Sequence, residues 1–306
     1  MLRLLRGILR WVLQFLGVLV AMLLIAAAVI YWRSSKVLDE HVDVHEAALT
    51  IPAADAEAIA RGQHLAITRG CGECHGADFG GKMVVDLLPV GRVAGPNLTH
   101  GKGGLPANFS DADWERAIRH GVAPDGRMLA IMPIRDFAAL TDADTADMIA
   151  FLRQVPAVDR EMPAVSIGPI LRLQMLLGAI PLAEARVIDH RSAHLAALTP
   201  SPSADYGRYL SHTCTGCHGE HFSGGQIPGL PPSFPAAANI TPDPNSGIGK
   251  WHKVDFYSAM RAGKRPNGSD INPFMPWAQF KQMSDTELDA LWAYLQTLPP
   301  RPTGGR

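Results

Sequence analysis

The sequence contains Cys71-Gly72-Glu73-Cys74-His75, and the same Cys-x-x-Cys-His pattern returns as Cys214-Thr215-Gly216-Cys217-His218. Two thiols at this spacing add across the vinyl groups of a haem, and the imidazole that follows at once ligates the iron. We therefore predict two covalently attached haem c groups, one on each copy of the pattern. The predicted attachment residues are Cys71, Cys74, Cys214 and Cys217, and the predicted iron ligands are His75 and His218.

One such pattern can also arise by chance, as a redox dithiol or as half of a zinc site. All four cysteines of the chain lie in the two patterns, so none remains for a disulfide framework or a separate four-cysteine zinc cluster. Each pattern also has a Met-Pro pair at the same distance. Met132-Pro133 lies 61 residues after Cys71, and Met275-Pro276 lies 61 residues after Cys214. This matched pairing favours haem over the alternatives.

A methionine sulfur opposite histidine gives iron a higher reduction potential than two imidazoles do. We predict Met132 and Met275 as the sixth ligands, because the proline after each fixes φ and stiffens the loop that presents the sulfur. Met128, in the same loop as Met132, is a rival ligand. Ligation by a second histidine is another alternative, although none of the candidates recurs in both halves. These candidates are His64, His100, His120, His212 and His221.

The first residues predict a membrane anchor. From Trp11 to Trp32 the chain is apolar except for Gln14, and these 22 residues would form a helix about 33 Å long, enough to cross a bilayer. More basic residues precede the run than follow it, which places the N-terminus in the cytoplasm and the rest in the periplasm. A cleaved signal peptide ending near Ala26-Ala27-Ala28 is the alternative. Either segment exports the haem motifs.

The chain has 306 residues, which suffices for two ordinary domains and an appendage. Its formal net charge of −1 gives no indication of nucleic-acid binding. We expect an anchor over residues 1–36, a solvated stalk over 37–54, and helical domains over 55–156 and 203–306. Residues 157–202 form the linker, whose apolar part we interpret as an amphipathic helix on a haem domain, on the membrane surface or on a partner subunit.

Equivalent residues recur in the two predicted domains. Gly62 and Gly207 precede the two motifs and would let another helix approach closely. The sequences starting at Thr141 and Ser284 predict capped last helices. A further set bonds either haem propionates or the chain's own turns, and the sequence leaves both readings open. This set is Asn97, Asn239, Trp251, Arg119 and Arg261.

Asn239-Ile240-Thr241-Pro242-Asp243, Gly247-Ile248-Gly249 and Met275-Pro276-Trp277, together with the two motifs, resemble the membrane-bound cytochrome c subunits of bacterial alcohol, aldehyde and sugar-acid dehydrogenases. The resemblance implies an all-α fold of two tandem class I-like cytochrome c domains behind the transmembrane helix. It also implies electron transfer from a dehydrogenase subunit to quinone or a terminal oxidase at the inner membrane. The sequence has two haem motifs, whereas the well-known members have three.

Electron transfer without catalysis is thus the expected function. Two other functions remain open at this point. A diheme peroxidase or thiosulfate-oxidising enzyme would need one iron with an open or displaceable ligand, which the matched Met-Pro pairs disfavour. A cytochrome subunit of a terminal oxidase would keep the electron-transfer role and change only the partner.

Overall fold

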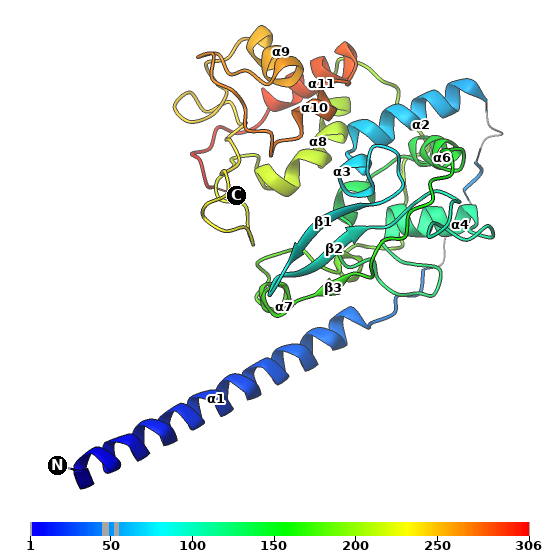
Figure 1. Ribbon diagram of the computed structural model, residues 1–306. Coiled ribbons are helices and arrows are strands. Elements are labelled where there is room, and N and C mark those ends of the chain that lie inside the picture. Colours follow the sequence, from blue (N-terminus) through cyan, green and yellow to red (C-terminus); the bar gives the residue numbers. More distant parts are fainter. Residues whose placement is uncertain (1, 45–48, 52–54, 306) are drawn as a thin grey trace.

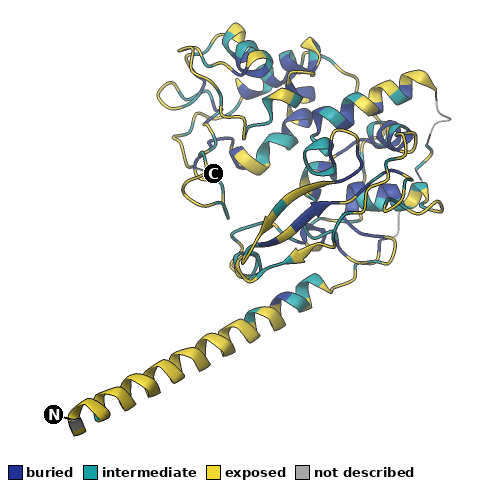
Figure 2. Ribbon diagram, in the orientation of Figure 1, coloured by how far each residue is buried: buried dark blue, intermediate teal, exposed yellow. Residues whose placement is uncertain are grey.

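The computed structural model describes residues 2–44, 49–51 and 55–305. It contains two adjacent, mainly helical domains and a long N-terminal helix, α1 (Leu2–Leu38), which projects away from them (Figure 1). The side chains of α1 are exposed along almost its whole length, although most are apolar (Figure 2). Within the described residues, α1 alone is long and apolar enough to cross a membrane. The predicted stalk falls partly on residues 45–48 and 52–54, which lie outside the described part.

The two domains have corresponding helices. The first contains α2 (Ala56–Thr68), α3 (Cys71–His75), α4 (Asp111–Glu115), the π-helical turn η1 (Arg116–His120), α5 (Ile134–Phe137) and α6 (Asp142–Leu152). The second contains α8 (Ala204–His218), α9 (Lys253–Ala262), α10 (Trp277–Phe280) and α11 (Asp285–Leu295). The linker carries α7 (Pro169–Leu176) and the short 3₁₀ turn η2 (Glu184–Arg186).

The expectation of an all-α fold is wrong in one region. The first domain and the linker form a three-stranded antiparallel sheet of β1 (Lys82–Leu87), β2 (Gly91–Gly95) and β3 (Ser166–Ile167). The register pairs Lys82 with Gly95 and Gly91 with Ile167. In the second domain the corresponding segment has Pro228, Pro231, Pro232 and Pro235. Proline cannot donate ladder hydrogen bonds, which explains why only an isolated bridge, Gly225 with Ala237, forms there.

In each domain the helix before the haem motif crosses the last helix at a glycine. A Cβ on Gly62 of α2 would collide with the carbonyl of Asp147 in α6, and one on Gly207 of α8 would collide with that of Ala290 in α11. The expected close approach at these glycines is therefore confirmed.

The helix that carries the motif differs between the domains. The first domain has two more residues between the crossing glycine and the first cysteine than the second domain has. Two extra helical residues would rotate the motif by about 200°. The chain avoids this by ending α2 at Thr68, passing through Arg69 and the left-handed Gly70 (φ 78°), and restarting as α3. In the second domain α8 runs unbroken into its motif.

The two domains contact each other through equivalent residues. The Nε2 of His64 in α2 lies 2.8 Å from a carboxylate oxygen of Glu287, the third residue of α11. The hydroxyl of Tyr209, which occupies the position of His64 in α8, donates to the carboxylate of Asp144, the third residue of α6. Each domain thus places its first helix on the capped N-terminus of the other domain's last helix, and the interface is approximately two-fold symmetric.

The pair of His64 and Glu287 is expected to make stability depend on pH. The hydrogen bond to Glu287 raises the pKa of His64. Burial opposes ionisation of Glu287, but the hydrogen bond and charge of His64 together with the hydrogen bonds from Ser284 outweigh it and lower the Glu287 pKa. The histidine contribution is fully present below its unfolded pKa of 6.5 and is lost as pH rises through the raised value. The glutamate contribution is present above its unfolded pKa of 4.5 and is lost as pH falls through the lowered value.

We therefore expect His64→Gln to cost about 1 kcal/mol of unfolding free energy between these two pKa values and much less in alkaline solution. Thermal unfolding of the haem-loaded chain at several pH values measures this difference. The control is His221→Gln, which changes an exposed histidine. An equal loss at all pH values would contradict the ion pair.

Part of the predicted stalk packs on the first domain. The Val42 amide donates to the Gly126 carbonyl over 2.9 Å. Val44 is buried in a cluster with Val122 and Met128. Residues 42–44 are therefore fixed to the domain surface, where the sequence had indicated a solvated linker.

Candidate haem-binding sites

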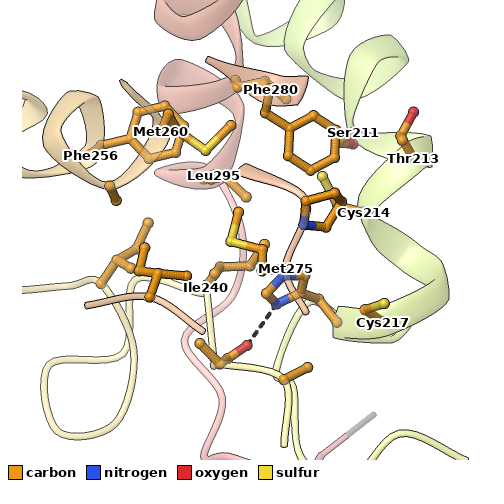
Figure 3. Close-up of a pocket in the computed structure, with 18 of the residues that line it drawn as sticks. Ser211, Thr213, Cys214, Cys217, Ile240, Phe256, Met260, Met275, Phe280 and Leu295 are labelled. Atoms are coloured by element: carbon orange, nitrogen blue, oxygen red, sulfur yellow. Dashed lines mark hydrogen bonds between the residues drawn. The ribbon is translucent and has the colours of Figure 1, made fainter. Parts of the chain in front are cut away.

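The second domain encloses an apolar cavity of about 300 Å³ beside its Cys-x-x-Cys-His motif. Cys214, Cys217 and His218 line it from α8, and Met275 reaches it from the loop before α10. Figure 3 shows the Met275 side chain between the helix that carries the two cysteines and the apolar side chains of α9. The two thiols, the imidazole and the thioether that the sequence predicted as one site are thus brought together.

The two histidines predicted to ligate iron each make a hydrogen bond to a backbone carbonyl. The Nδ1 of His218 lies 2.7 Å from the carbonyl oxygen of Ala238, and the Nδ1 of His75 lies 2.9 Å from that of Pro96. A carbonyl only accepts, so Nδ1 carries the hydrogen and Nε2 keeps its lone pair for a metal. Burial lowers the pKa of His75, which favours the neutral form that ligates iron.

The two Met-Pro loops also share one backbone geometry. The amide of Ile134 donates to the Met132 carbonyl over 2.9 Å, and the amide of Trp277 donates to the Met275 carbonyl over 2.7 Å. In each loop the proline that follows the methionine has φ near −78° and precedes a one-turn helix. The methionines therefore leave the backbone at equivalent points.

The rival Met128 lies elsewhere. It is 2 % exposed and belongs to the small cluster with Val44 and Val122. Met132, in contrast, packs against the main core, as Cys71 does. Two of the histidine rivals also have other partners, since His64 bonds Glu287 and the Nδ1 of His120 lies 3.0 Å from that of His190.

The residues present fit a haem attached through thioethers. Burial raises the pKa of the Cys71 and Cys214 thiols to about 12, and an uncharged thioether suits such surroundings. In the first domain, Trp114 occupies the position of Phe256, which lines the second cavity. Its buried indole N–H has no hydrogen-bond partner among the described residues, so a haem carboxylate would satisfy it.

Asn97 and Asn239 bond their own loops, which is one of the two readings that the sequence left open, and these loops orient the histidines. The Oδ1 of Asn239 accepts from the amide (2.9 Å) and the hydroxyl (2.8 Å) of Thr241, and its Nδ2 donates to the Arg301 carbonyl over 2.6 Å. Asn97 accepts from Thr99 at the same two distances and donates to the Val158 carbonyl over 2.7 Å. Each asparagine directly follows the residue whose carbonyl binds the histidine. The repeated Asn-x-Thr spacing was the available signal.

The paired arginines also bond their own chain. Arg119 donates to the Leu140 carbonyl over 2.9 Å and to the Asp142 carboxylate over 2.7 Å. Arg261 donates to the Lys281 carbonyl and, over 2.7 Å, to the carboxylate of Asp285, the position equivalent to Asp142. Both arginines therefore fix the start of the last helix of their domain.

The two attachment motifs meet at the domain interface. The Thr215 hydroxyl, inside the second motif, donates to the Asp136 carboxylate of α5 over 3.4 Å. Gln279 of α10, at the position equivalent to Asp136, donates to Glu73 inside the first motif. The helix after each Met-Pro loop thus contacts the other domain's motif, and the two sites are adjacent.

Two domains of this kind, each with an attachment motif on a helix and a Met-Pro loop beside it, define a c-type cytochrome. The chain belongs to the cytochrome c family, whose model, Cytochrome c, matches residues 59–156 and 204–299. Each matched segment contains one attachment motif, which supports two covalently bound haem c groups.

Several curated relatives are similar to the chain. The fructose dehydrogenase cytochrome subunit of Gluconobacter japonicus is 26% identical over 285 residues, which cover 84% of this chain and 56% of the relative. The gluconate 2-dehydrogenase cytochrome c subunit of Pantoea cypripedii is 37% identical over 94 residues, covering 29% and 21%. A diheme cytochrome c-type protein of Cereibacter sphaeroides is 31% identical over 139 residues, covering 42% and 47%. The matches to the fructose and alcohol dehydrogenase cytochrome subunits cover most of this chain. They cover little more than half the length of those subunits.

Proposed function

We propose that this chain is a membrane-tethered diheme cytochrome c that carries electrons from a dehydrogenase to the respiratory chain, with quinone or a terminal oxidase as acceptor, at the periplasmic face of the inner membrane. The observation that carries the proposal is the convergence of Cys214, Cys217, His218 and Met275 on one apolar cavity. In the first domain His75 and Met132 make the same backbone contacts as His218 and Met275 do.

In this proposal His75 and Met132 hold one iron, and His218 and Met275 hold the other. When bound, each haem supplies a one-electron iron couple. With these four side chains as ligands, neither iron would keep a coordination site for a substrate. The carbonyls of Pro96 and Ala238 fix the histidine rings. The mostly apolar lining would bury the haem in the second domain, and burial is one of the means by which a protein sets a haem potential.

The proposed anchor is α1, and a second apolar surface lies beside its C-terminal end. Arg172 of α7 donates to the Ser34 hydroxyl over 2.7 Å and covers the ring of Tyr31 at 4.6 Å. The start of α7 is joined to the β1–β2 turn, where the Gly168 amide donates to the Val90 carbonyl over 2.9 Å. Large apolar side chains of the turn and of α7 are exposed; they are Leu87, Leu88, Ile170, Leu173 and Leu177. We propose that this surface lies in the lipid headgroup region.

Fluorescent labelling tests this placement. Leu88 is 88 % exposed, and we expect a polarity-sensitive dye on Leu88→Cys to shift to the blue when the full chain is reconstituted in liposomes. The native cysteines, as thioethers, would not react. The control is Val254→Cys, at a residue 72 % exposed on α9 of the other domain, whose dye should not shift. Suppose that the dye at position 88 shows no blue shift although the chain stays in the membrane after carbonate extraction. That result would contradict the proposed headgroup-region surface, but not the α1 anchor.

The names of the relatives support a dehydrogenase as electron donor. Purification from membranes in mild detergent, followed by identification of the bound proteins, tests this. We expect a flavin- or quinoprotein dehydrogenase subunit, whose substrate should then reduce both haems. Recovery with oxidase subunits alone would contradict the proposed donor and favour the terminal-oxidase role.

A further inference from the structure

Arg69 belongs to the first domain by sequence, but its side chain lies in the second. It occupies the two-residue break between α2 and α3, two residues before Cys71. Its Nη1 donates to the Leu210 carbonyl over 3.2 Å and to the Thr213 hydroxyl over 3.0 Å, both in α8. Its guanidinium carbon lies 5.0 Å from the centre of the Tyr209 ring. The break therefore directs this side chain across the domain interface.

The Arg69 guanidinium is a buried cation at the second haem site. The residue is 5 % exposed and lines the cavity beside Thr213 and Cys214. Its two hydrogen bonds are to uncharged groups. Its Nη2, also buried, has no hydrogen-bond partner among the described residues. A positive charge that is neither solvated nor paired acts strongly on its neighbours, because the protein interior screens poorly.

The surrounding charges cancel it only in part. Asp136 faces the same region from α5, but burial, followed by repulsion from Glu184, raises its pKa to about 7. Glu184 of η2 pairs instead with Arg135 over 3.2 Å. The position of the second domain equivalent to Arg69 is His212. Burial lowers the pKa of His212, which favours its neutral form. The interface therefore carries a cation on one side and an uncharged imidazole on the other.

We infer that Arg69 raises the reduction potential of the haem in the second domain relative to that in the first. Reduction adds one electron to the iron, and a nearby positive charge stabilises the reduced state. With both haems bound, one electron would then pass from the reduced first site to the oxidised second site, and no bond or proton would need to move. This inference rests on the proposed function, and it makes Arg69 a residue that sets the direction of electron flow.

An optical redox titration of the full haem-loaded chain in detergent tests the inference. Two one-electron waves are assigned to the domains with Met275→Ala. We expect Arg69→Met to lower the second wave, so that the ratio of reduced to oxidised second haem at the wild-type midpoint falls about tenfold, or about 59 mV for one electron. The first wave should move less. Arg69→Lys should restore most of the potential, because it keeps the charge.

Two further variants separate the charge from a purely structural role. Thr213→Val removes one hydrogen bond of Arg69 and leaves its charge, so the second wave should move much less than in Arg69→Met. Asp136→Asn, measured above the Asp136 pKa, removes an opposing carboxylate and should raise the second wave. If Arg69→Met loses its haems, Arg69→Gln replaces it and should likewise lower the second wave, and Asp136→Asn should still raise it.

An equal shift in Arg69→Met and Thr213→Val, or an unmoved second wave in Arg69→Met, would overturn the inference. If both haems retain their sulfur-to-iron bands, that result contradicts the role of Arg69 alone. A wild-type protein that lacks these bands would contradict the proposed ligation, and the inference with it.

Discussion

Met275→Ala is expected to abolish the weak far-red sulfur-to-iron band of one haem and to lower its reduction potential. The Met275 side chain lines the cavity beside His218, and alanine cannot reach the iron. Loss of the thioether removes the ligand that raises the potential. The open iron should also bind CO rapidly in the reduced state, whereas the wild-type protein should bind it at neither haem. Absorption spectra and a redox titration of the haem-loaded chain measure all three effects.

Met132→Ala should produce the same changes at the other haem, because its loop has the geometry of the Met275 loop. Met128→Ala is the matched control in this loop. It removes a side chain buried with Val44 and Val122, so it should reduce stability and leave both bands intact. Loss of a band in Met128→Ala, with both bands present in Met132→Ala, would show that the wrong methionine has been proposed. Rapid CO binding by the wild-type protein would instead favour a diheme enzyme.

Asn239→Ala is expected to destabilise the second domain by about 3 kcal/mol or more, because each buried polar group left unsatisfied costs about 1–3 kcal/mol. The substitution removes the acceptor of the Thr241 amide and hydroxyl and the donor to the Arg301 carbonyl. It also loosens the loop that positions the neighbouring Ala238 carbonyl, the hydrogen-bond acceptor of His218 Nδ1. Thermal unfolding monitored by haem absorption measures the loss.

The control is Asn245→Ala, an exposed residue of the same loop. It should leave both stability and spectrum close to wild type. A second haem whose spectrum stays native after Asn239→Ala, at temperatures where the variant is folded, would show that Asn239 supports the fold and does not position the histidine.

The sequence was sufficient for the features that depend on local spacing. Each cysteine pair and its histidine lie within five residues, so their chemistry can be predicted without the fold. Gly62 and Gly207 indicated a close helix crossing because only glycine permits one there, and the structure confirms it. The predicted last-helix caps at Thr141 and Ser284 are also present. Membership of the cytochrome c family agrees with the resemblance inferred from the motifs.

The sequence was insufficient where the outcome depends on partners far away in the chain. The first domain's strands were missed because short apolar runs do not distinguish a strand from a helix. β1 and β2 pair locally, but the third strand, β3, joins β2 from the distant linker. Asn239 could equally bond a propionate or a turn until the fold brought Arg301 to it. The contact of His64 with Glu287 joins residues 223 positions apart.

Local spacing in the chain thus specified which residues attach the haems, because covalent geometry and helix periodicity act over a few residues. The tertiary structure alone decided how the two sites face each other and that Arg69 reaches the second one. The two-residue break between α2 and α3 turns the Arg69 side chain away from the first domain. Only the packing of the second domain against the first determines where the Arg69 guanidinium is buried.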